Sequence, residues 1–299
     1  MTMTQTSVTA VAPFPPVPVE KPIEMHNPGL YARRAVVQGV SGGFAAVTDA
    51  HLEQYRELGF LSIKDAFSPD EVRDALAGLL DLIAGKRPDF KDIQFEASVR
   101  GKLDTLTLDQ RQDAVRKLMW FTPHEPRLNA MAQHLGLLAL VGRVLNQPAD
   151  APLKMFQDMA LLKPPRLGRE KPWHQDKAYF NIDSREQVVG VWIALDAATL
   201  DNGCMHLMPQ LPRQPITHFQ RRDWQVCDTE ILGETCVAAP LKPGGMLLFD
   251  GLLVHGTPHN TSDQRRRAVQ FHYHAQRYGS VPNEARMELF GSEGKDVEC

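Results

Sequence analysis

The sequence has few cysteines and no long apolar run. Only four of its 299 residues are cysteines, and none of them forms a C-x-x-C pair. Neither a zinc site nor a disulfide framework is therefore indicated, and we expect reduced thiols. No apolar stretch approaches the roughly 20 residues of a membrane-spanning helix, and the N-terminus does not resemble a signal peptide. We predict a cytoplasmic protein with no membrane partner.

The sequence also lacks an excess of positive charge. Its 33 lysines and arginines face 36 acidic residues, which gives a net charge of -3 at pH 7. Proteins that bind nucleic acid through its phosphates usually carry a basic surface, so we expect no nucleic-acid partner. With 43% hydrophobic residues the chain is long enough to bury a large core. A soluble globular protein is predicted, of unknown oligomeric state.

Residues 1–45 have the composition of an arm. Five prolines between residues 13 and 22 cannot sustain a helix or a central strand, so we expect an extended or disordered lead-in. Residues 46–299 are assigned to a single domain.

The two halves of that domain differ in their hydrophobic patterns. The first half predicts a short strand at 60–63 and three helices, at residues 48–58, 68–83 and 126–145. The second half predicts short strands at residues 155–162, 188–195, 204–208, 246–254 and 268–274. Several short strands separated by turn residues indicate a sandwich or jelly roll. The predicted fold class is α+β, with mainly N-terminal helices packed outside a double β-sheet.

One short stretch of the second half could bind a metal ion. In an extended segment alternate side chains point the same way, so His174 and Asp176 would project together while Gln175 faces away. With a second imidazole they would form the 2-His-1-carboxylate triad of iron oxygenases. His255 is the candidate third ligand and His259 its only substitute. With 11 histidines and 36 acidic residues, H-x-[DE] should occur about once by chance, so the motif needs support.

That support comes from the segment after His255. Residues 258–263 predict a turn, and the strand that follows would return antiparallel and bring Arg266 close to His255. Alternation gives this strand one face with Arg266, Ala268, Gln270 and His272, and another with Val269, Phe271 and Tyr273. A guanidinium inside a cavity is a natural partner for a carboxylate, because it donates two parallel hydrogen bonds and keeps its charge.

Together these motifs resemble the phytanoyl-CoA dioxygenase family of iron(II)- and 2-oxoglutarate-dependent oxygenases. The resemblance extends from about residue 55 to about residue 275. Four segments carry it: residues 174–176, 191–196, 201–205 and 255–266. The Pro-Gly-Ser-His usual after the Asn-Gly-Cys segment appears here as residues 209–212, Pro-Gln-Leu-Pro. This departure concerns a loop and its substrate contacts rather than the metal ligands.

The resemblance implies a double-stranded β-helix of the jelly-roll or cupin-like type, and a role for each matching residue. His174, Asp176 and His255 would hold iron(II), and Arg266 with the Thr257 hydroxyl would bind the distal carboxylate of 2-oxoglutarate. Five further residues occupy positions where related enzymes contact or wall in the cosubstrate: Lys117, Gln157, Met159, Gln175 and Trp192. Dioxygen would be the other cosubstrate. The expected reaction hydroxylates, or otherwise oxidises, an unactivated C–H bond of a small organic substrate and releases succinate and carbon dioxide. Desaturation and cyclisation would be variations of it.

Alternatives remain at this stage. Met159 and Trp192 could simply pack within strands, and Lys117 could lie on a solvated helix face. A cupin-like metalloenzyme could use the same triad without 2-oxoglutarate. A non-catalytic jelly-roll module could use the cavity to bind a ligand, although such a scaffold has no physical need for the triad and Arg266 together.

Overall fold

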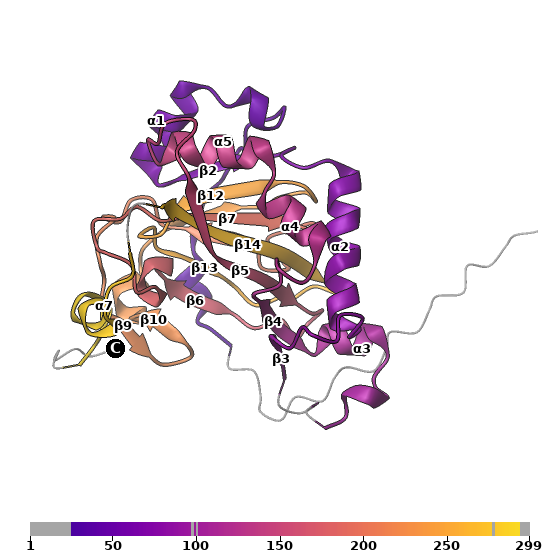
Figure 1. Cartoon of the computed structure of the whole chain (residues 1–299). Helices are drawn as coiled ribbons and strands as arrows, with labels where there is room; N and C mark the ends of the chain where they lie inside the picture. Colours follow the sequence, from indigo (N-terminus) through magenta and orange to yellow (C-terminus); the bar gives the residue numbers. More distant parts are fainter. Residues whose placement is uncertain (1–24, 97–98, 100, 277–278, 294–299) are drawn as a thin grey trace, which may run out of the picture.

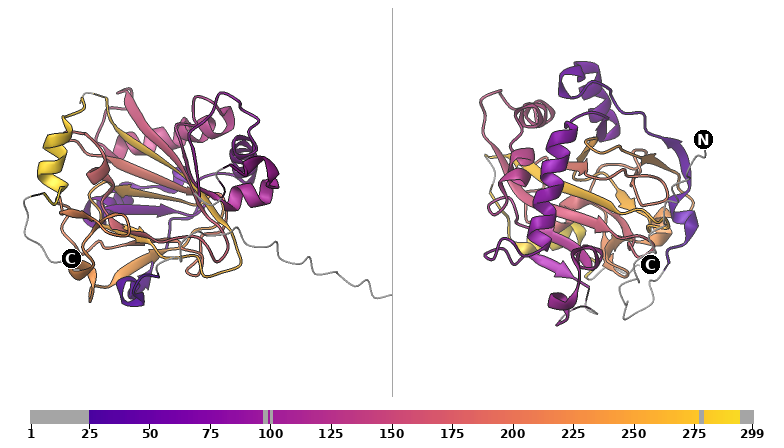
Figure 2. Two further views of the ribbon diagram at one scale, coloured as in Figure 1. Left: turned by 90° about the horizontal axis from the view of Figure 1, so that it is seen from below. Right: turned by 90° about the vertical axis from the view of Figure 1, so that its right-hand side faces the viewer.

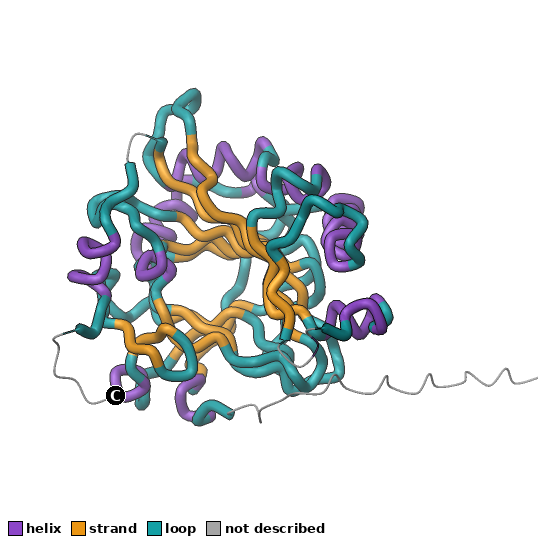
Figure 3. Tube along the Cα trace, turned by 60° about the horizontal axis from the view of Figure 1, so that its bottom comes forward, coloured by secondary structure: helices purple, strands orange, loops and turns teal. Residues whose placement is uncertain are grey.

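Two β-sheets face each other and helices cover the outer side of the larger one (Figure 1). The computed structural model describes residues 25–96, 99, 101–276 and 279–293. Figures 2 and 3 show the same arrangement from other sides, with the strands in two layers and most helices on one flank. The α+β prediction with a jelly-roll core is confirmed.

The larger sheet has seven strands and the smaller sheet has five. In spatial order the larger sheet contains β2 (Phe60–Ile63), β12 (Met246–Asp250), β7 (Val189–Ala194), β14 (Arg266–Ala275), β5 (Leu153–Lys163), β4 (Val115–Met119) and β3 (Ile93–Phe95). The smaller sheet contains β1 (Arg33–Val36), β11 (Cys236–Ala239), β8 (Met205–Leu207), β13 (His255–Thr257) and β6 (Lys171–His174). A separate hairpin consists of β9 (His218–Gln220) and β10 (Trp224–Val226).

The helices lie mainly in the first half of the chain, as predicted. The α-helices are α1 (Asp49–Leu58), α2 (Pro69–Ile83), α3 (Leu108–Asp113), α4 (Pro126–Ala132), α5 (Leu135–Val144), α6 (Asp228–Ile231) and α7 (Asn283–Phe290). Short 3-10 helices are η1 (Pro28–Tyr31), η2 (Phe44–Ala46), η4 (Leu103–Thr105) and η5 (Asp176–Tyr179). Among the helices of the described residues, none combines the length and apolar composition that a bilayer span requires.

Local sequence explains where α2 begins. The Ser68 hydroxyl accepts a hydrogen bond from the Glu71 backbone N–H at 3.3 Å, and the Glu71 carboxylate accepts one from the Ser68 N–H at 2.8 Å. This reciprocal capping box satisfies two amide groups that a helix start otherwise leaves without partners. The buried face of the helix, which includes Leu79 and Ile83, packs in the core that covers the larger sheet.

The single helix predicted at 126–145 is wrong, because two helices occupy this segment. α4 ends at Ala132, and α5 starts after His134, whose ring Nδ1 accepts a hydrogen bond from the Gly136 N–H at 3.1 Å. The apolar period continues across the break, so hydrophobic spacing does not reveal it.

The strand predicted at 246–254 is shorter in the structure. β12 ends at Asp250, whose carboxylate accepts a hydrogen bond from the Leu252 N–H at 2.8 Å, and the chain then enters the smaller sheet as β13. The predicted antiparallel pairing of the strands that carry His255 and Arg266 is therefore wrong. β14 pairs instead with β5 and β7.

The predicted alternation along β14 is confirmed. Val269, Phe271 and Tyr273 belong to the core that faces the helices. Arg266 and Gln270 line a cavity between the two sheets. A strand with one apolar and one polar buried face thus separates the helical layer from the interior of the sandwich.

The cysteines depart from the expected reduced state at one position. Cys204 and Cys236 are free and buried. Cys227, however, is disulfide-bonded, so the expectation of reduced thiols is wrong for this residue.

Part of the predicted N-terminal arm lies against the domain. Residues 1–24 are outside the described residues, but residues 25–45 include η1 and β1. β1 pairs in parallel with β11, and Leu30 and Tyr31 are buried. The division into an arm and a domain at residue 45 stays a prediction.

Replacing Ser68 by alanine should destabilise the protein by about 1 kcal/mol, because it removes the side-chain cap of α2. Urea unfolding of the Ser68→Ala and Ser68→Asp variants would measure this, since aspartate restores an acceptor at the cap. An unchanged free energy of unfolding in Ser68→Ala would show that the capping box contributes nothing to stability.

Candidate functional site

The three residues of the predicted triad meet in one place. His174 ends β6, Asp176 begins η5, and His255 begins β13 directly opposite His174. Asp176 Oδ1 lies 3.2 Å from His174 Nε2 and 3.6 Å from His255 Nε2, and all three side chains are buried. Neighbouring ligands about 2.1 Å from one metal ion lie roughly 3 Å apart, so the three atoms could share a single ion.

Backbone carbonyls orient both imidazoles. His174 Nδ1 donates to the Pro172 carbonyl at 2.7 Å, and His255 Nδ1 donates to the Leu253 carbonyl at 2.9 Å. Each ring therefore directs its Nε2 lone pair toward Asp176. Burial and the neighbouring His255 lower the pKa of His174 to about 4, so this ring is neutral at neutral pH. The neutral His174 ring in this orientation is ready to bind a metal ion.

The Asp176 carboxylate is held from the opposite sheet. Its Oδ2 lies 3.0 Å from Gln270 Nε2 and 2.8 Å from His272 Nε2, and both residues belong to β14. Burial opposes ionisation of Asp176, but the charges of His255 and His272 outweigh this effect and hold its pKa well below the usual range. Oδ2 is thus occupied by hydrogen bonds, and Oδ1 faces the two imidazoles.

Sequence reasoning did not assign these roles to Gln270 and His272. The signal that could have found them was available, since alternation along β14 placed both residues on the same face as Arg266. What it could not show was that Asp176 lies on the other side of the cavity, within reach of that face.

Gln175 differs from the expectation that it contacts the cosubstrate. Its side chain does not line the cavity, and its amide nitrogen donates to the Leu252 and Gln214 carbonyls at 2.7 and 2.8 Å. Its amide oxygen accepts from the Ile216 N–H at 2.9 Å. The correction has a simple physical reason: Gln175 faces away from His174 and Asp176, as strand alternation predicts. It links the segment between these ligands to the turn before His255.

A cavity of about 560 Å³ lies between the sheets at the triad. Besides the three triad residues, six of the other predicted site residues line it: Lys117, Gln157, Met159, Trp192, Thr257 and Arg266. The structure therefore brings together every predicted site residue except Gln175. His259, the substitute considered for His255, is not among the lining residues.

In the described part of the chain, Arg266 is one of two buried cations that line this cavity, together with Lys163. Only 2% of its surface is exposed, Nη1 donates to the Leu161 carbonyl at 3.1 Å, and Nε has no partner. The guanidinium carbon lies 5.4 Å from the centre of the Trp192 ring. Burial lowers the pKa of Arg266 to about 10, so the side chain stays positively charged at neutral pH. Among the described residues no carboxylate forms an ion pair with it.

The arginines on either side of Arg266 point elsewhere. Arg265 pairs with Asp113 at 2.7 Å, and Arg267 pairs with Asp196 at 2.7 Å. Strand alternation thus separates one inward arginine from two that form ordinary ion pairs.

Further polar atoms of the cavity wall also lack partners. Gln157 Oε1 and Trp192 Nε1 are buried without a hydrogen bond in the described structure, as is Arg266 Nε. Buried polar groups are usually satisfied, so such a group of cavity-lining atoms indicates a polar ligand. The unpaired guanidinium of Arg266 and the indole N–H of Trp192 are both donors, and together they suit a carboxylate. The residues present therefore fit a carboxylate-bearing cosubstrate next to a metal ion.

Lys117 lies on β4 rather than on the solvated helix face considered from the sequence. Its side chain is half-buried, and no salt bridge or hydrogen bond of its ammonium group occurs within the described part of the chain. Burial and the nearby Lys171 lower its pKa. Lys117 is therefore a further cation of the cavity without an acidic partner among the described residues.

Comparison with known sequences identifies the relatives of this chain. The family model described as phytanoyl-CoA dioxygenase matches residues 55–268, which include the triad and Arg266. A phytanoyl-CoA dioxygenase domain-containing protein 1 from Danio rerio is 27% identical over 261 residues, covering 76% of this chain and 89% of the relative.

Solved structures show the same architecture. EvdO2 from Micromonospora carbonacea var. aurantiaca is 25% identical, with a TM-score of 0.60 over 85% of this chain and 99% of EvdO2. EvdO2 has also been solved in complex with 2-oxoglutarate. The epimerase SnoN, solved with Fe3+, alpha-ketoglutarate and nogalamycin RO, is 18% identical, with a TM-score of 0.60 over 84% of this chain and 91% of SnoN. At that identity the likeness shows the fold alone.

Replacing Gln270 by leucine should weaken metal binding by about 10-fold or more, because partners of a ligating carboxylate usually matter to this extent. Isothermal titration with Mn(II) would measure the change. Gln112→Leu is the matched control, since Gln112 is also a buried glutamine but lies outside the cavity. Equal Mn(II) affinity in both variants would contradict a role for Gln270 in holding Asp176.

Proposed function

Since this chain belongs to the phytanoyl-CoA dioxygenase family, we propose that it is an iron(II)- and 2-oxoglutarate-dependent dioxygenase that hydroxylates an unactivated C–H bond of a small organic substrate. The balanced reaction consumes the substrate, 2-oxoglutarate and dioxygen, and it forms the alcohol, succinate and carbon dioxide. The observation that carries the proposal is one cavity that contains both a 2-His-1-carboxylate set and an unpaired buried arginine.

Each side chain has a defined task in this proposal. His174, Asp176 and His255 hold the iron, and Gln270 and His272 fix the orientation of the carboxylate ligand. Arg266 binds the distal carboxylate of 2-oxoglutarate, with the Thr257 hydroxyl beside it. When bound, iron and 2-oxoglutarate together supply the activation of dioxygen.

The wall of the cavity supports a small organic substrate. Apolar side chains make up much of it, including Met119, Met159, Leu161, Leu167 and Phe180. These residues would exclude water and hold carbon atoms of the substrate near the triad. The volume of about 560 Å³ lies within the usual range for small-molecule sites.

Arg266 distinguishes this proposal from a cupin-like enzyme that uses the triad without 2-oxoglutarate. Such an enzyme needs the metal ligands but has no need for an unpaired guanidinium in the same cavity. Burying an unpaired charge is costly. A buried cation that has no partner in the protein therefore usually pairs with a bound ligand. The Trp192 indole N–H, which lines the cavity and also lacks a partner, supports a carboxylate-bearing cosubstrate in the same way.

Replacing Arg266 by methionine should raise the Kd for 2-oxoglutarate about 30-fold or more, because truncating one side of a buried charged pair costs several kcal/mol. Anaerobic titration of the iron(II)-loaded protein, monitored through the visible charge-transfer band of the chelated cosubstrate, would give this Kd. Arg265→Met removes the neighbouring, ion-paired arginine and is the control. If the band and its Kd were the same in both variants, the cupin-like alternative would gain support.

Loss of a metal ligand should abolish turnover. In the His174→Ala and Asp176→Ala variants, succinate formation from 2-oxoglutarate should fall to the rate without enzyme, since neither variant retains three protein ligands. His124→Ala removes a histidine outside the cavity and should behave like the wild type. Iron-dependent succinate formation that persists in both ligand variants would exclude this assignment of the centre.

A further inference from the structure

The two strands that carry the metal ligands form a weak pair. Among the strands of the described residues, β6 is at the edge of this sheet and pairs there with β13 alone. His255 lies opposite His174, but Thr257 lies opposite Lys171, so the register shifts between these positions. Pro172 stands at this irregularity and has no N–H to donate. Few backbone hydrogen bonds therefore fix the two strands relative to each other.

An N-terminal strap, residues 25–36, crosses the outer face of the same sheet. Its C-terminal end is β1, at the edge of the sheet opposite β6. Its Tyr31 ring contacts His206 of β8 edge-on at 5.3 Å and stacks on Trp173 of β6 at 4.9 Å. The strap thus reaches from one edge of the sheet to the other.

Tyr31 packs against the outer face of β6 and β13, the two strands that carry His174 and His255. A Cβ atom at Gly256 would lie 3.2 Å from the Tyr31 hydroxyl and 3.3 Å from Trp173, closer than most real Cβ contacts. Gly256 separates His255 from Thr257, and Trp173 precedes His174. Because successive strand residues face opposite sides, Tyr31 packs against the residues whose neighbours enter the cavity.

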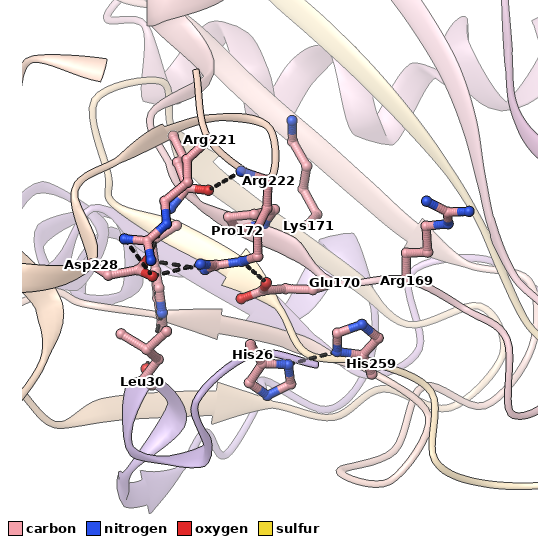
Figure 4. A network of polar contacts seen from close by, with 12 residues as sticks. His26, Leu30, Arg169, Glu170, Lys171, Pro172, Arg221, Arg222, Asp228 and His259 are labelled. Atoms are coloured by element: carbon pink, nitrogen blue, oxygen red, sulfur yellow. Dashed lines mark hydrogen bonds and ion pairs between the residues drawn. The ribbon is translucent and has the colours of Figure 1, made fainter. Parts of the chain in front are cut away.

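Buried polar contacts anchor the strap in this position. The Tyr31 hydroxyl donates to Glu170 Oε1 at 2.9 Å, and Glu170 Oε2 accepts from Arg222 Nε at 2.8 Å. The Leu30 carbonyl accepts from the Trp173 indole N–H at 3.0 Å. Figure 4 shows Glu170 and Arg222 together, with Arg222 extending to Asp228.

A second contact of the strap lies beyond Thr257. His26 and His259 approach through their Nδ1 atoms at 2.6 Å, with 5° between their ring planes. Figure 4 marks this contact between the edges of the two rings. His259 follows Thr257 by two residues. The strap therefore contacts the chain on both sides of the position proposed to bind the distal carboxylate of 2-oxoglutarate.

We infer that the N-terminal strap positions the metal and cosubstrate site from outside the cavity, with Tyr31 as its main positioning residue. Tyr31 touches neither the metal ligands' donor atoms nor the cosubstrate position. It holds β6 and β13 in the irregular register that places His174, His255 and Thr257 together. This inference rests on the proposed function for its cosubstrate part, whereas its metal part stands on the triad alone.

The test compares two tyrosines whose buried hydroxyls donate hydrogen bonds. Tyr31→Phe removes the bond to Glu170 and a longer one, at 3.4 Å, to the Lys171 carbonyl of β6. Tyr273→Phe removes a 2.7 Å bond to the Ala132 carbonyl on the helix side of the larger sheet. Both full-length variants should lose thermal stability. Only Tyr31→Phe should raise the Kd for Mn(II), and the Kd for 2-oxoglutarate from the charge-transfer band, by about 10-fold.

The outcomes are distinguishable. Equal Mn(II) and 2-oxoglutarate affinities in the two variants, at comparable stability, would overturn the positioning role of Tyr31. His26→Ala keeps the Tyr31 hydrogen bond to Glu170, although it removes an edge-on ring contact with Tyr31. It should weaken 2-oxoglutarate binding more than Mn(II) binding, because His259 follows Thr257. An unchanged 2-oxoglutarate affinity would overturn the role of the His26 end. A wild-type protein that binds Mn(II) but shows no band would exclude the proposed function, and the Mn(II) comparison would still decide the strap.

Discussion

The site depends on the hydrogen bonds that Asp176 receives across the cavity. Its Oδ2 is held by Gln270 and His272 of the larger sheet, while the two imidazoles come from the smaller one. A buried carboxylate is costly unless it is paired, so these contacts make the two sheets close over the site rather than leave it open to water. The hydrogen bonds from Gln270 and His272 that orient Asp176 therefore also help to fix the spacing between the two sheets.

The cavity also carries positive charge. Arg266 and Lys117 bring this charge without an acidic partner among the described residues, although the chain as a whole carries a net charge of -3. Both cations lie on the larger sheet, whereas the two ligand imidazoles lie on the smaller one and Asp176 follows in η5. A molecule with two carboxylates and a keto group could span the two, which explains why a sandwich rather than a single sheet serves this chemistry.

The sequence predicted the residues of the centre better than their spatial relations. The spacing of His174 and Asp176 was sufficient because the extended backbone at Gln175 keeps the two side chains together, and alternation correctly divided the faces of β14. The pattern along the chain singled out His255 and Arg266, and the family resemblance added Thr257 and the role of each residue. Three features could not be read because they depend on contacts distant in the chain: the break before α5, the crossing between β12 and β13, and the burial of Tyr31 against Glu170. Gln175 was misassigned because proximity to ligands along the chain does not decide which way a side chain faces.

β14 contributes Arg266, Gln270 and His272 from one continuous strand. Their spacing of four and two residues keeps all three on the inner face, and its outer face packs under the helices. Shifting the strand by one residue would exchange these faces and bury Arg266 in the apolar layer. Side chains along β14 can therefore be exchanged one at a time, whereas a single inserted or deleted codon within it would remove the cosubstrate anchor, the carboxylate support and the outer core together. New substrate preferences in this scaffold are consequently expected to arise in the loops around the cavity, where changes of length leave that strand intact.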